Sequence, residues 1–357
     1  MRPQDAELTK LLNESFVPVR LVNMKDVDLN FFQFDYDLTF AVLMMNANGY
    51  VYSRFGSMDG THTTDRMSVE GLKHAMRAVR STHPTRVKAV PPLRLPPTTL
   101  NDLPAFAQSK QAGEACYHCH FVGAFRFKQL RVENKFTKAM VHQFPLPENI
   151  GITLDVDKNN LVKAVTPESP ADQAGVRTGD VLVNAIAPGQ VGALNLYTAA
   201  DLQFALNEVA DPGFVLLHVL RAKERITVSL KLPSGWRKHD VSWRSSQATF
   251  APTVGVWGMA LSAEEKRARG IAADRMAVKV TFFFNGPEWV ASRGALQLND
   301  VIVGINGETL PSMTIRQFHS HFRLNFNVGD TVTLNVLRGD RKLDLPVPCT
   351  KAGDGEV

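Results

Sequence analysis

The alternation of apolar and polar residues in the first part of the chain predicts short α and β elements. Leucines recur at helical spacing in residues 5–15, and apolar and polar residues alternate in residues 16–22, as is typical of a strand. Apolar runs at 39–45 and 50–55 flank the turn-forming sequence Asn-Ala-Asn-Gly, which predicts a β-hairpin. A second amphipathic helix is expected over residues 65–82.

From residue 84 onward the pattern changes to a proline-rich stretch, a helix and a series of strands. Residues 84–104 hold many prolines and show little periodicity, so we expect a semi-extended linker there. A helix is predicted over residues 124–142. The further elements expected up to residue 235 are strands at 151–156, 161–165 and 214–232 and a helix at 198–207.

One short motif carries the most specific chemistry in the sequence. Cys116 and Cys119 are followed directly by His120, which gives the pattern Cys-x-x-Cys-His. This spacing suits covalent haem c, because the two thiols can add to the two vinyl groups and the next imidazole can ligate the iron. Met140 and His142 are the nearest downstream candidates for the sixth iron ligand.

Three other interpretations of this motif stay open. A Cys-x-x-Cys pair can be a redox-active dithiol or a structural disulfide. It can also form half of a zinc site, for which Cys349 is the only further cysteine, so that a distant His142 or His239 would have to complete the ligands. The spacing favours haem c over these alternatives.

A second informative stretch runs from Ser169 to Leu182. Its sequence, Ser-Pro-Ala-Asp-Gln-Ala-Gly-Val-Arg-Thr-Gly-Asp-Val-Leu, resembles the bacterial PDZ family. The resemblance implies a domain that binds the carboxyl terminus of a peptide by strand addition beside a helix, with backbone N–H groups around the carboxylate. Carried over to this sequence, the carboxylate nest comprises Asn149, Ile150, Gly151 and Ile152, and the pocket is lined by Leu202, Ala205 and Leu206. An ordinary apolar core would use the same residue types, so this alternative stays open.

The PDZ-like pattern occurs a second time. Residues 293–302 match the first motif at an offset of 120, which places Asp300 over Asp180. The sequence Gly255-Val256-Trp257 near the start of this region is similar to PDZ domains of envelope-stress serine proteases. The second motif is degraded, and we find no hydrolase signature such as Gly-x-Ser-x-Gly, so a protease is not expected.

The predicted order of helix, strand, hairpin and helix at the N-terminus resembles the later part of a thioredoxin-like domain. Residues 13–21 correspond to the segment after the redox helix of that family. The family's first strand and redox turn have no counterpart, because no cysteine precedes Cys116, and the proline expected near Leu38 is missing. We expect a truncated domain, with an upstream Cys or selenocysteine turn and an export signal lying before Met1.

Charge and hydropathy argue against two broad classes of protein, nucleic-acid-binding proteins and proteins with membrane-spanning helices. The formal net charge is +5, but basic and acidic residues are mixed along the chain, so nucleic-acid binding is not expected. No apolar run reaches the roughly 18 residues of a membrane-spanning helix. Haem c matures outside the cytoplasm, so a periplasmic or cell-envelope location is expected although no signal peptide is visible.

The whole chain resembles a family of planctomycete-type envelope proteins, some of them selenoproteins, on motifs that include residues 144–149 and 235–238. The resemblance implies an α+β multidomain protein with a truncated thioredoxin-like α/β domain, a helical Cys-x-x-Cys-His segment and two PDZ-like β-rich domains. The expected parts are the thioredoxin-like domain (1–83), a proline-rich linker (84–104), the haem-c-like segment (105–147), the first PDZ domain, PDZ1 (148–235), a linker (236–253), the second, PDZ2 (254–349), and a tail (350–357).

These features together predict a redox-linked scaffold outside the cytoplasm. In this hypothesis the PDZ domains bind protein C-terminal tails or peptides, while haem c on Cys116 and Cys119, with its iron on His120, exchanges electrons with a redox partner. One alternative is a PDZ adaptor without haem, and another is a dithiol-disulfide oxidoreductase. No catalytic residue is assigned.

Overall fold

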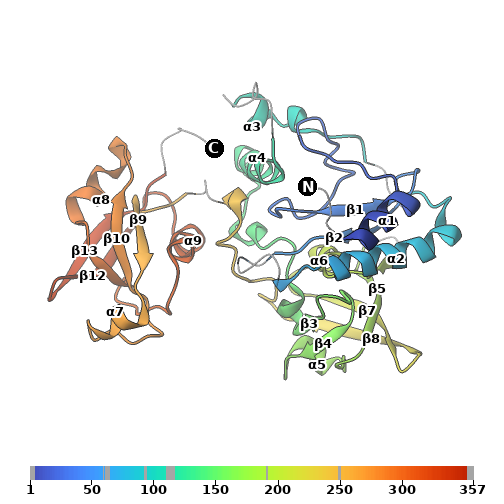
Figure 1. Cartoon of the computed structure of the whole chain (residues 1–357). Helices are drawn as coiled ribbons and strands as arrows, with labels where there is room; N and C mark the ends of the chain where they lie inside the picture. The colour runs from blue at the N-terminus through green and yellow to red at the C-terminus, as the bar shows by residue number, and fades with distance from the viewer. Residues whose placement is uncertain are drawn as a thin grey trace. The chain divides into compact units, whose positions relative to one another are not determined.

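The chain divides into two compact units, residues 1–239 and residues 240–357. The computed structural model describes residues 5–58, 60, 65–91, 95–109, 117–189, 192–247 and 251–351. The first unit runs from blue to yellow in Figure 1, and the β-sheet of the second is drawn in orange and red. Within the described ranges, no helix combines the length and the apolar character that crossing a membrane requires.

The first unit begins with a small α/β module. Its regular elements are α1 (Ala6–Ser15), β1 (Val42–Met45), β2 (Val51–Phe55) and α2 (Val69–Arg86). Asp5 and Ser68 cap the two helices, because their side-chain oxygens accept from the N–H groups of Leu8 and Gly71. The helices and the hairpin share one apolar core, formed by Leu8, Leu11, Met44, Tyr52, Phe55, Ala75, Met76 and Val79. The predicted helices and hairpin are therefore present.

The strand predicted at residues 16–22 is not formed. The segment pairs with no other strand in the described structure, where β1 and β2 pair only with each other. Val17 and Val19 are 90% and 78% exposed. An alternating sequence becomes a stable strand only when a neighbour supplies backbone hydrogen bonds and a packing face. The thioredoxin-like assignment, which needs a strand here, stays a prediction.

The proline-rich stretch differs from the semi-extended tether that its composition predicts. Residues 95–109 contain η2 (Leu100–Asp102) and α3 (Pro104–Ala107), and Leu100 and Phe106 are fully buried. Both side chains pack near α4 (Cys119–Val132) in a core with Met24, Leu29, Phe34, Tyr36, Tyr117, Val122 and Phe125. Burial of a few large apolar side chains is enough to anchor a segment that has no periodic pattern.

Helix α4 is shorter than the sequence predicts. It ends at Val132 rather than near residue 142, and Asn134 then adopts a φ of 56°, which a right-handed helix cannot continue. A short 3₁₀ turn, η4 (Lys138–Val141), follows. Both proposed sixth ligands of the iron, Met140 and His142, therefore lie outside this helix.

PDZ1 is built from two small antiparallel sheets and two α-helices, of which α6 is the longer. The sheets have the strand orders β3-β4 and β6-β5-β7-β8. Its elements are η5 (Pro147–Ile150), β3 (Ile152–Leu154), β4 (Val162–Val165), α5 (Pro170–Gln173), β5 (Val181–Ile186), β6 (Leu194–Asn195), α6 (Ala199–Asn207), β7 (Gly213–Arg221) and β8 (Glu224–Leu232). The strands and the helix predicted for this region are present, with ends shifted by one or two residues.

PDZ2 forms most of the second unit and has one five-stranded antiparallel sheet with the order β13-β12-β11-β10-β9. The elements of this unit are η6 (Ser245–Gln247), β9 (Val256–Ala260), α7 (Ala263–Arg267), β10 (Val278–Phe283), η7 (Pro287–Trp289), α8 (Val290–Ala295), β11 (Val301–Ile305), α9 (Ile315–Asn325), β12 (Thr331–Arg338) and β13 (Arg341–Pro348). Strand β9 is at the edge of the sheet, and α9 lies beside it (Figure 1).

The internal repeat places the same buried ion pair in both domains. Asp180 and Asp300 each stand directly before a strand, and each is 1% exposed. Arg221 donates to both carboxylate oxygens of Asp180 at 2.7 Å, and Arg338 does the same to Asp300 at 2.8 and 2.7 Å. These bidentate pairs fix the start of β5 and of β11 to the end of the opposite strand.

Candidate peptide-binding site

The pocket residues predicted in PDZ1 lie together, but they are buried. Ile150, Ile152, Leu202, Ala205 and Leu206 are all 0% exposed. They belong to the main apolar core of the domain, in which α6 packs on the strands. The sequence could not separate pocket from core here, because both need apolar side chains on the same face of α6.

The predicted carboxylate nest is also occupied by contacts within the chain. The N–H groups of Asn149 and Gly151 donate to the carbonyls of Leu146 and Glu148, which closes the η5 turn. The Asn149 side chain donates to the carbonyl of Trp236 at 2.9 Å. Two of the predicted donors are therefore already used in this conformation.

The other face of α6 holds part of the chain that precedes PDZ1. Gln203 and Asn207 stand one helical turn apart on this face. The amide nitrogen of Gln203 donates to the carbonyl of Phe144 at 3.3 Å, and the N–H of Phe144 donates to Asn207 at 2.9 Å. The hydroxyl of Ser57 donates to Gln203 at 2.9 Å. Two side chains of α6 thus bind both backbone groups of one residue.

Asp201 anchors the hairpin of the N-terminal module to the start of α6. Its carboxylate accepts from the hydroxyl of Ser53 at 2.7 Å, the N–H of Arg54 at 2.7 Å and the N–H of Tyr197 at 3.0 Å. The guanidinium of Arg54 lies 3.5 Å from the ring centroid of Phe204. Burial raises the pKa of Asp201 to about 6, against the opposing effect of the Arg54 N–H.

In PDZ2, the strand that lies beside the domain's helix α9 is the edge strand β9. The carbonyl of Gly255 accepts from the N–H of Phe284, and the N–H of Leu261 donates to the carbonyl of Ala277, so the odd-numbered residues of β9 bond toward β10. Strand alternation then directs the backbone groups of Val256, Gly258 and Ala260 to the opposite edge. No strand pairs with that edge in the described part of the chain.

His319 lies on the side of α9 that faces this edge. Thr314 caps α9 as Thr198 caps α6, so His319 and Gln203 both come five residues after the cap. The ring of His319 stacks on Trp257, with centroids 5.4 Å apart and an interplanar angle of 18°. Its Nδ1 lies 3.0 Å from the hydroxyl oxygen of Thr253. The aromatic pair connects the edge strand to the helix.

The imidazole of His319 is buried and neutral. Burial, followed by the nearby charge of Arg323, lowers the pKa of His319 to about 4. Its Nε2 is buried and makes no hydrogen bond of normal geometry among the residues that the structure describes, although the Val256 backbone lies close enough to raise the pKa slightly. A buried polar nitrogen without a partner is costly, so this atom favours a ligand that offers it a hydrogen bond.

Large apolar side chains surround the free edge. Trp257, Met259 and Phe282 are 40%, 62% and 51% exposed, and Phe282 pairs with Trp257 across β9 and β10. From the sequence, Gly255-Val256-Trp257 was recognisable only as a resemblance, and no pattern singled out His319, Met259 or Phe282. The capping Thr314 was the available signal, because it aligns α9 with the helix of PDZ1.

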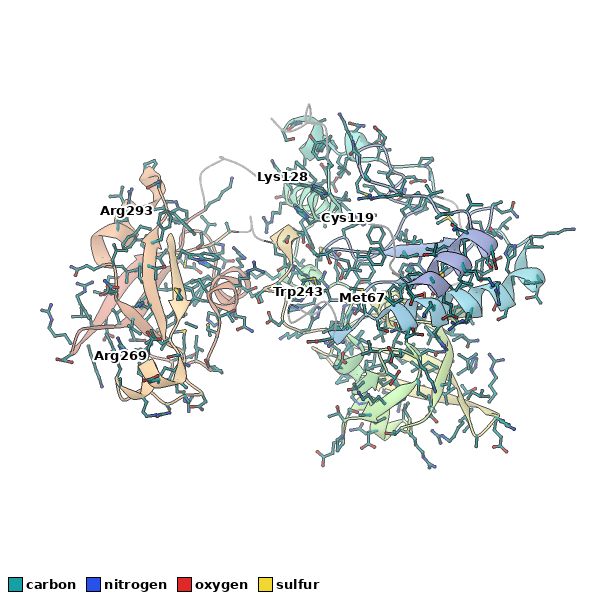
Figure 2. All side chains as sticks on the ribbon, viewed as in Figure 1. Met67, Cys119, Lys128, Trp243, Arg269 and Arg293 are labelled. Atoms are coloured by element: carbon teal, nitrogen blue, oxygen red, sulfur yellow. The ribbon has the colours of Figure 1, made fainter. Side chains whose placement is uncertain are left out.

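The Cys-x-x-Cys-His motif is described only in part. Cys116 lies outside the described residues, whereas Cys119, labelled in Figure 2, is the first residue of α4. His120 is the second. Burial raises the pKa of the Cys119 thiol, which disfavours the thiolate that a redox dithiol needs. Burial, followed by His118, lowers the pKa of His120, so its imidazole is neutral at pH 7, the form that ligates metals.

The proposed sixth ligands lie in different surroundings. Met140 belongs to η4 and is 37% exposed. His142 lies against His239, with ring centroids 5.4 Å apart, and its carbonyl faces the guanidinium of Arg237 at 3.4 Å. In the described ranges, no group of three or more His, Cys, Asp or Glu side chains is arranged to hold a metal ion.

The chain is similar to proteins of the HtrA type, although no protein-family model matches it. A probable periplasmic serine endoprotease, DegP-like, from Pseudomonas savastanoi pv. phaseolicola is 28% identical over 200 residues. The match covers 55% of this chain and 38% of that protein, so the chain spans well under half of this relative's length. These similarities support a PDZ-containing protein.

Solved structures of the same kind also match. The HtrA3 PDZ domain bound to a phage-derived ligand is 19% identical, with a TM-score of 0.21, and the match covers 28% of this chain and 84% of that one. The HtrA-type protease AlgW with a decapeptide is 19% identical, with a TM-score of 0.26, over 54% of this chain and 55% of that one.

Proposed function

We propose that this chain is a peptide-binding adaptor of the cell envelope, in which PDZ2 binds the carboxyl-terminal tail of a partner protein. The observation that carries the proposal is the free edge of β9 beside α9. A tail that enters there adds a strand to the sheet, because the backbone groups of Val256, Gly258 and Ala260 point outward. The periplasmic DegP-like relative supports the envelope location.

The loop before β9 is suited to hold the terminal carboxylate. Gly255 has a φ of 70°, and a Cβ at this position would meet the ring of Trp289 at 2.3 Å, so a glycine is required. The loop therefore turns tightly and brings the N–H of Val256 to the free edge, where it can donate to an anion. Trp257 and Met259 then contact the side chains of the bound tail.

The test compares the same peptide with a free and with an amidated carboxyl terminus. Decapeptides selected against the full chain from a library with randomised C-terminal residues serve as probes. Amidation is expected to weaken binding at least tenfold, because it removes the negative charge of the peptide's terminal carboxylate, to which the N–H of Val256 would donate. Equal affinity for the two forms would reject tail recognition at this loop. An internal sequence of the same composition is the matched control.

A second function, covalent haem binding, is supported by the adjacent Cys119 and His120 at the start of α4. A neutral, half-buried imidazole directly after a thiol is the donor set that haem c uses. When bound, the haem would supply one-electron transfer. Cys116 and Cys119 would hold the porphyrin, and His120 would orient it.

Absorbance and intact mass after periplasmic expression with a haem-attachment system test this function. The wild-type chain should gain the mass of one haem and a haem absorbance band. Both should be lost in Cys116→Ala, while Cys349→Ala, which removes the cysteine outside the motif, should keep them. A wild-type chain without the added mass would refute haem binding but leave peptide binding untouched.

A further inference from the structure

The N-terminal module contacts PDZ1 at the start of α6 and at the turn that follows β3. On the helix side, Asp201 accepts from Ser53 and Arg54 of β2. The hydroxyl of Thr198, the cap of α6, also donates to the carbonyl of Arg54. The module therefore reaches the start of α6 through the hydroxyl of Ser53 and both backbone groups of Arg54.

The same module also covers the turn that follows β3. Ser68, the cap of α2, donates to Asp157 at 2.7 Å. Gly71 lies so close that a Cβ there would meet the carbonyl oxygen of Val156 at 2.5 Å. The ring of His74 lies 3.3 Å from the side-chain oxygen of Asn160. The module thus contacts the turn between β3 and β4 as well as α6.

The segment that links the module to PDZ1 also binds to α6. Phe144 bonds to Gln203 and Asn207 through its carbonyl and its N–H. A peptide that used these two amide side chains would have to displace Phe144. If the peptide also displaced the hairpin, the buried carboxylate of Asp201 would lose the hydrogen bonds from Ser53 and Arg54, which is unfavourable.

PDZ2 has a different residue at the helix position that corresponds to Gln203. His319 occupies it, and its Nε2 has no partner within the described residues. The two domains therefore differ at equivalent helix positions. In PDZ1, Gln203 of α6 binds Phe144 of the same chain, whereas in PDZ2 the Nε2 of His319 on α9 can bind a ligand.

We infer that PDZ1 is the internal docking domain for the N-terminal module and is closed to tails, so that each chain binds one peptide, through PDZ2. This inference depends on the proposed function for its stoichiometry, but not for the docking itself. PDZ1 then binds the β1–β2 hairpin of the same chain rather than the free carboxyl terminus of another protein.

The stoichiometry is measured by calorimetric titration of the full chain with a selected decapeptide that has a free carboxylate. We expect one peptide per chain. Met259→Asp, on the rim of β9, should weaken binding at least tenfold, whereas Gln203→Ala, on α6, should change it less than twofold. Two peptides per chain, or loss of binding in Gln203→Ala, would overturn the inference.

Hydrogen exchange tests the docking without any peptide. Residues 51–57 should exchange slowly in the full chain and at least tenfold faster in Asp201→Ala, with the protection of β7 and β8 retained. Glu224→Ala, an exposed acidic residue of β8, is the control and should change neither. Rapid exchange of residues 51–57 in the wild type would reject docking. If no peptide binds while this protection holds, the proposed function fails and the docking stands.

Discussion

PDZ1 and PDZ2 show how the same helix position serves two purposes. Both helices start at a threonine cap, and both domains hold a buried Asp–Arg pair. Five residues after the cap, PDZ1 has Gln203 and PDZ2 has His319. The amide of Gln203 can donate and accept at once, so it binds a backbone segment and a hydroxyl together.

The imidazole of His319 behaves differently because it is flat and aromatic. It stacks on Trp257 and uses one ring nitrogen toward Thr253, which leaves the other without a partner among the described residues. A shared fold thus fixes where the helix lies, whereas a single side chain on the helix decides which group it binds.

Removal of the repeated carboxylate should have the largest effect on stability. Asp180→Ala and Asp300→Ala each remove a buried carboxylate that accepts from an arginine and from a backbone N–H, and each should cost about 3 kcal/mol of unfolding free energy. Chemical denaturation of the full chain measures both. Asp180→Ala should affect the transition of residues 1–239 and Asp300→Ala that of residues 240–357. The exposed Glu264→Ala is the control, and unequal effects of the two variants would break the equivalence of the domains.

Removal of the docking carboxylate should be the next largest effect. Asp201→Ala leaves the hydroxyl of Ser53 and the N–H groups of Arg54 and Tyr197 without their acceptor, which should cost about 2 kcal/mol. Asp201→Asn keeps one acceptor oxygen and should cost less. Thermal unfolding of the first unit measures the loss. A full loss of stability in Asp201→Asn, equal to that in Asp201→Ala, would mean that the charge rather than the hydrogen bonds holds the hairpin.

The two units should respond to acid in opposite directions. Asp201 has a folded pKa of about 6, above the ordinary 3.8, so the folded state binds more protons between these values and its stability falls as pH rises through 6. His319 has a folded pKa of about 4, below the ordinary 6.5, so PDZ2 loses stability as pH falls from 6.5 toward 4.

Between pH 7 and pH 5 each change should amount to about 1–2 kcal/mol, by proton linkage. Denaturation of the full chain at several pH values measures both slopes. Asp201→Asn should remove the contribution of Asp201 to the slope of the first unit, and His319→Gln that of His319 to the slope of the second, which leaves the smaller contributions of His120 and His321. Parallel slopes in the two units would contradict the burial of these groups.

The smallest expected effect concerns the rim of the peptide site. Trp257→Ala removes a ring, 40% exposed, that a bound tail would contact, and should weaken binding about tenfold. Phe214, which is 46% exposed on β7 of PDZ1, gives the matched control Phe214→Ala. Similar losses of affinity in the two variants would mean that PDZ2 has no special role.

Local chemistry made part of this structure predictable from the sequence. The hairpin at residues 42–55, the helix after Thr198 and the strands of PDZ1 follow from periodicity, caps and turn residues, which act within a few positions. The repeat also identified Asp180 and Asp300 as equivalent. The strand at residues 16–22 was wrong because its pattern needed a neighbour that the described structure does not supply.

The candidate site was less predictable, for a physical reason. The sequence alone determined that two PDZ-like patterns are present and that Cys119 and His120 are adjacent, since both are statements about order along the chain. Only the tertiary structure decided that Ile150, Leu202 and Leu206 are core and that β9 is an edge. Burial and strand order depend on contacts between residues far apart in the chain, as when Ser53 meets Asp201, and no local pattern encodes them.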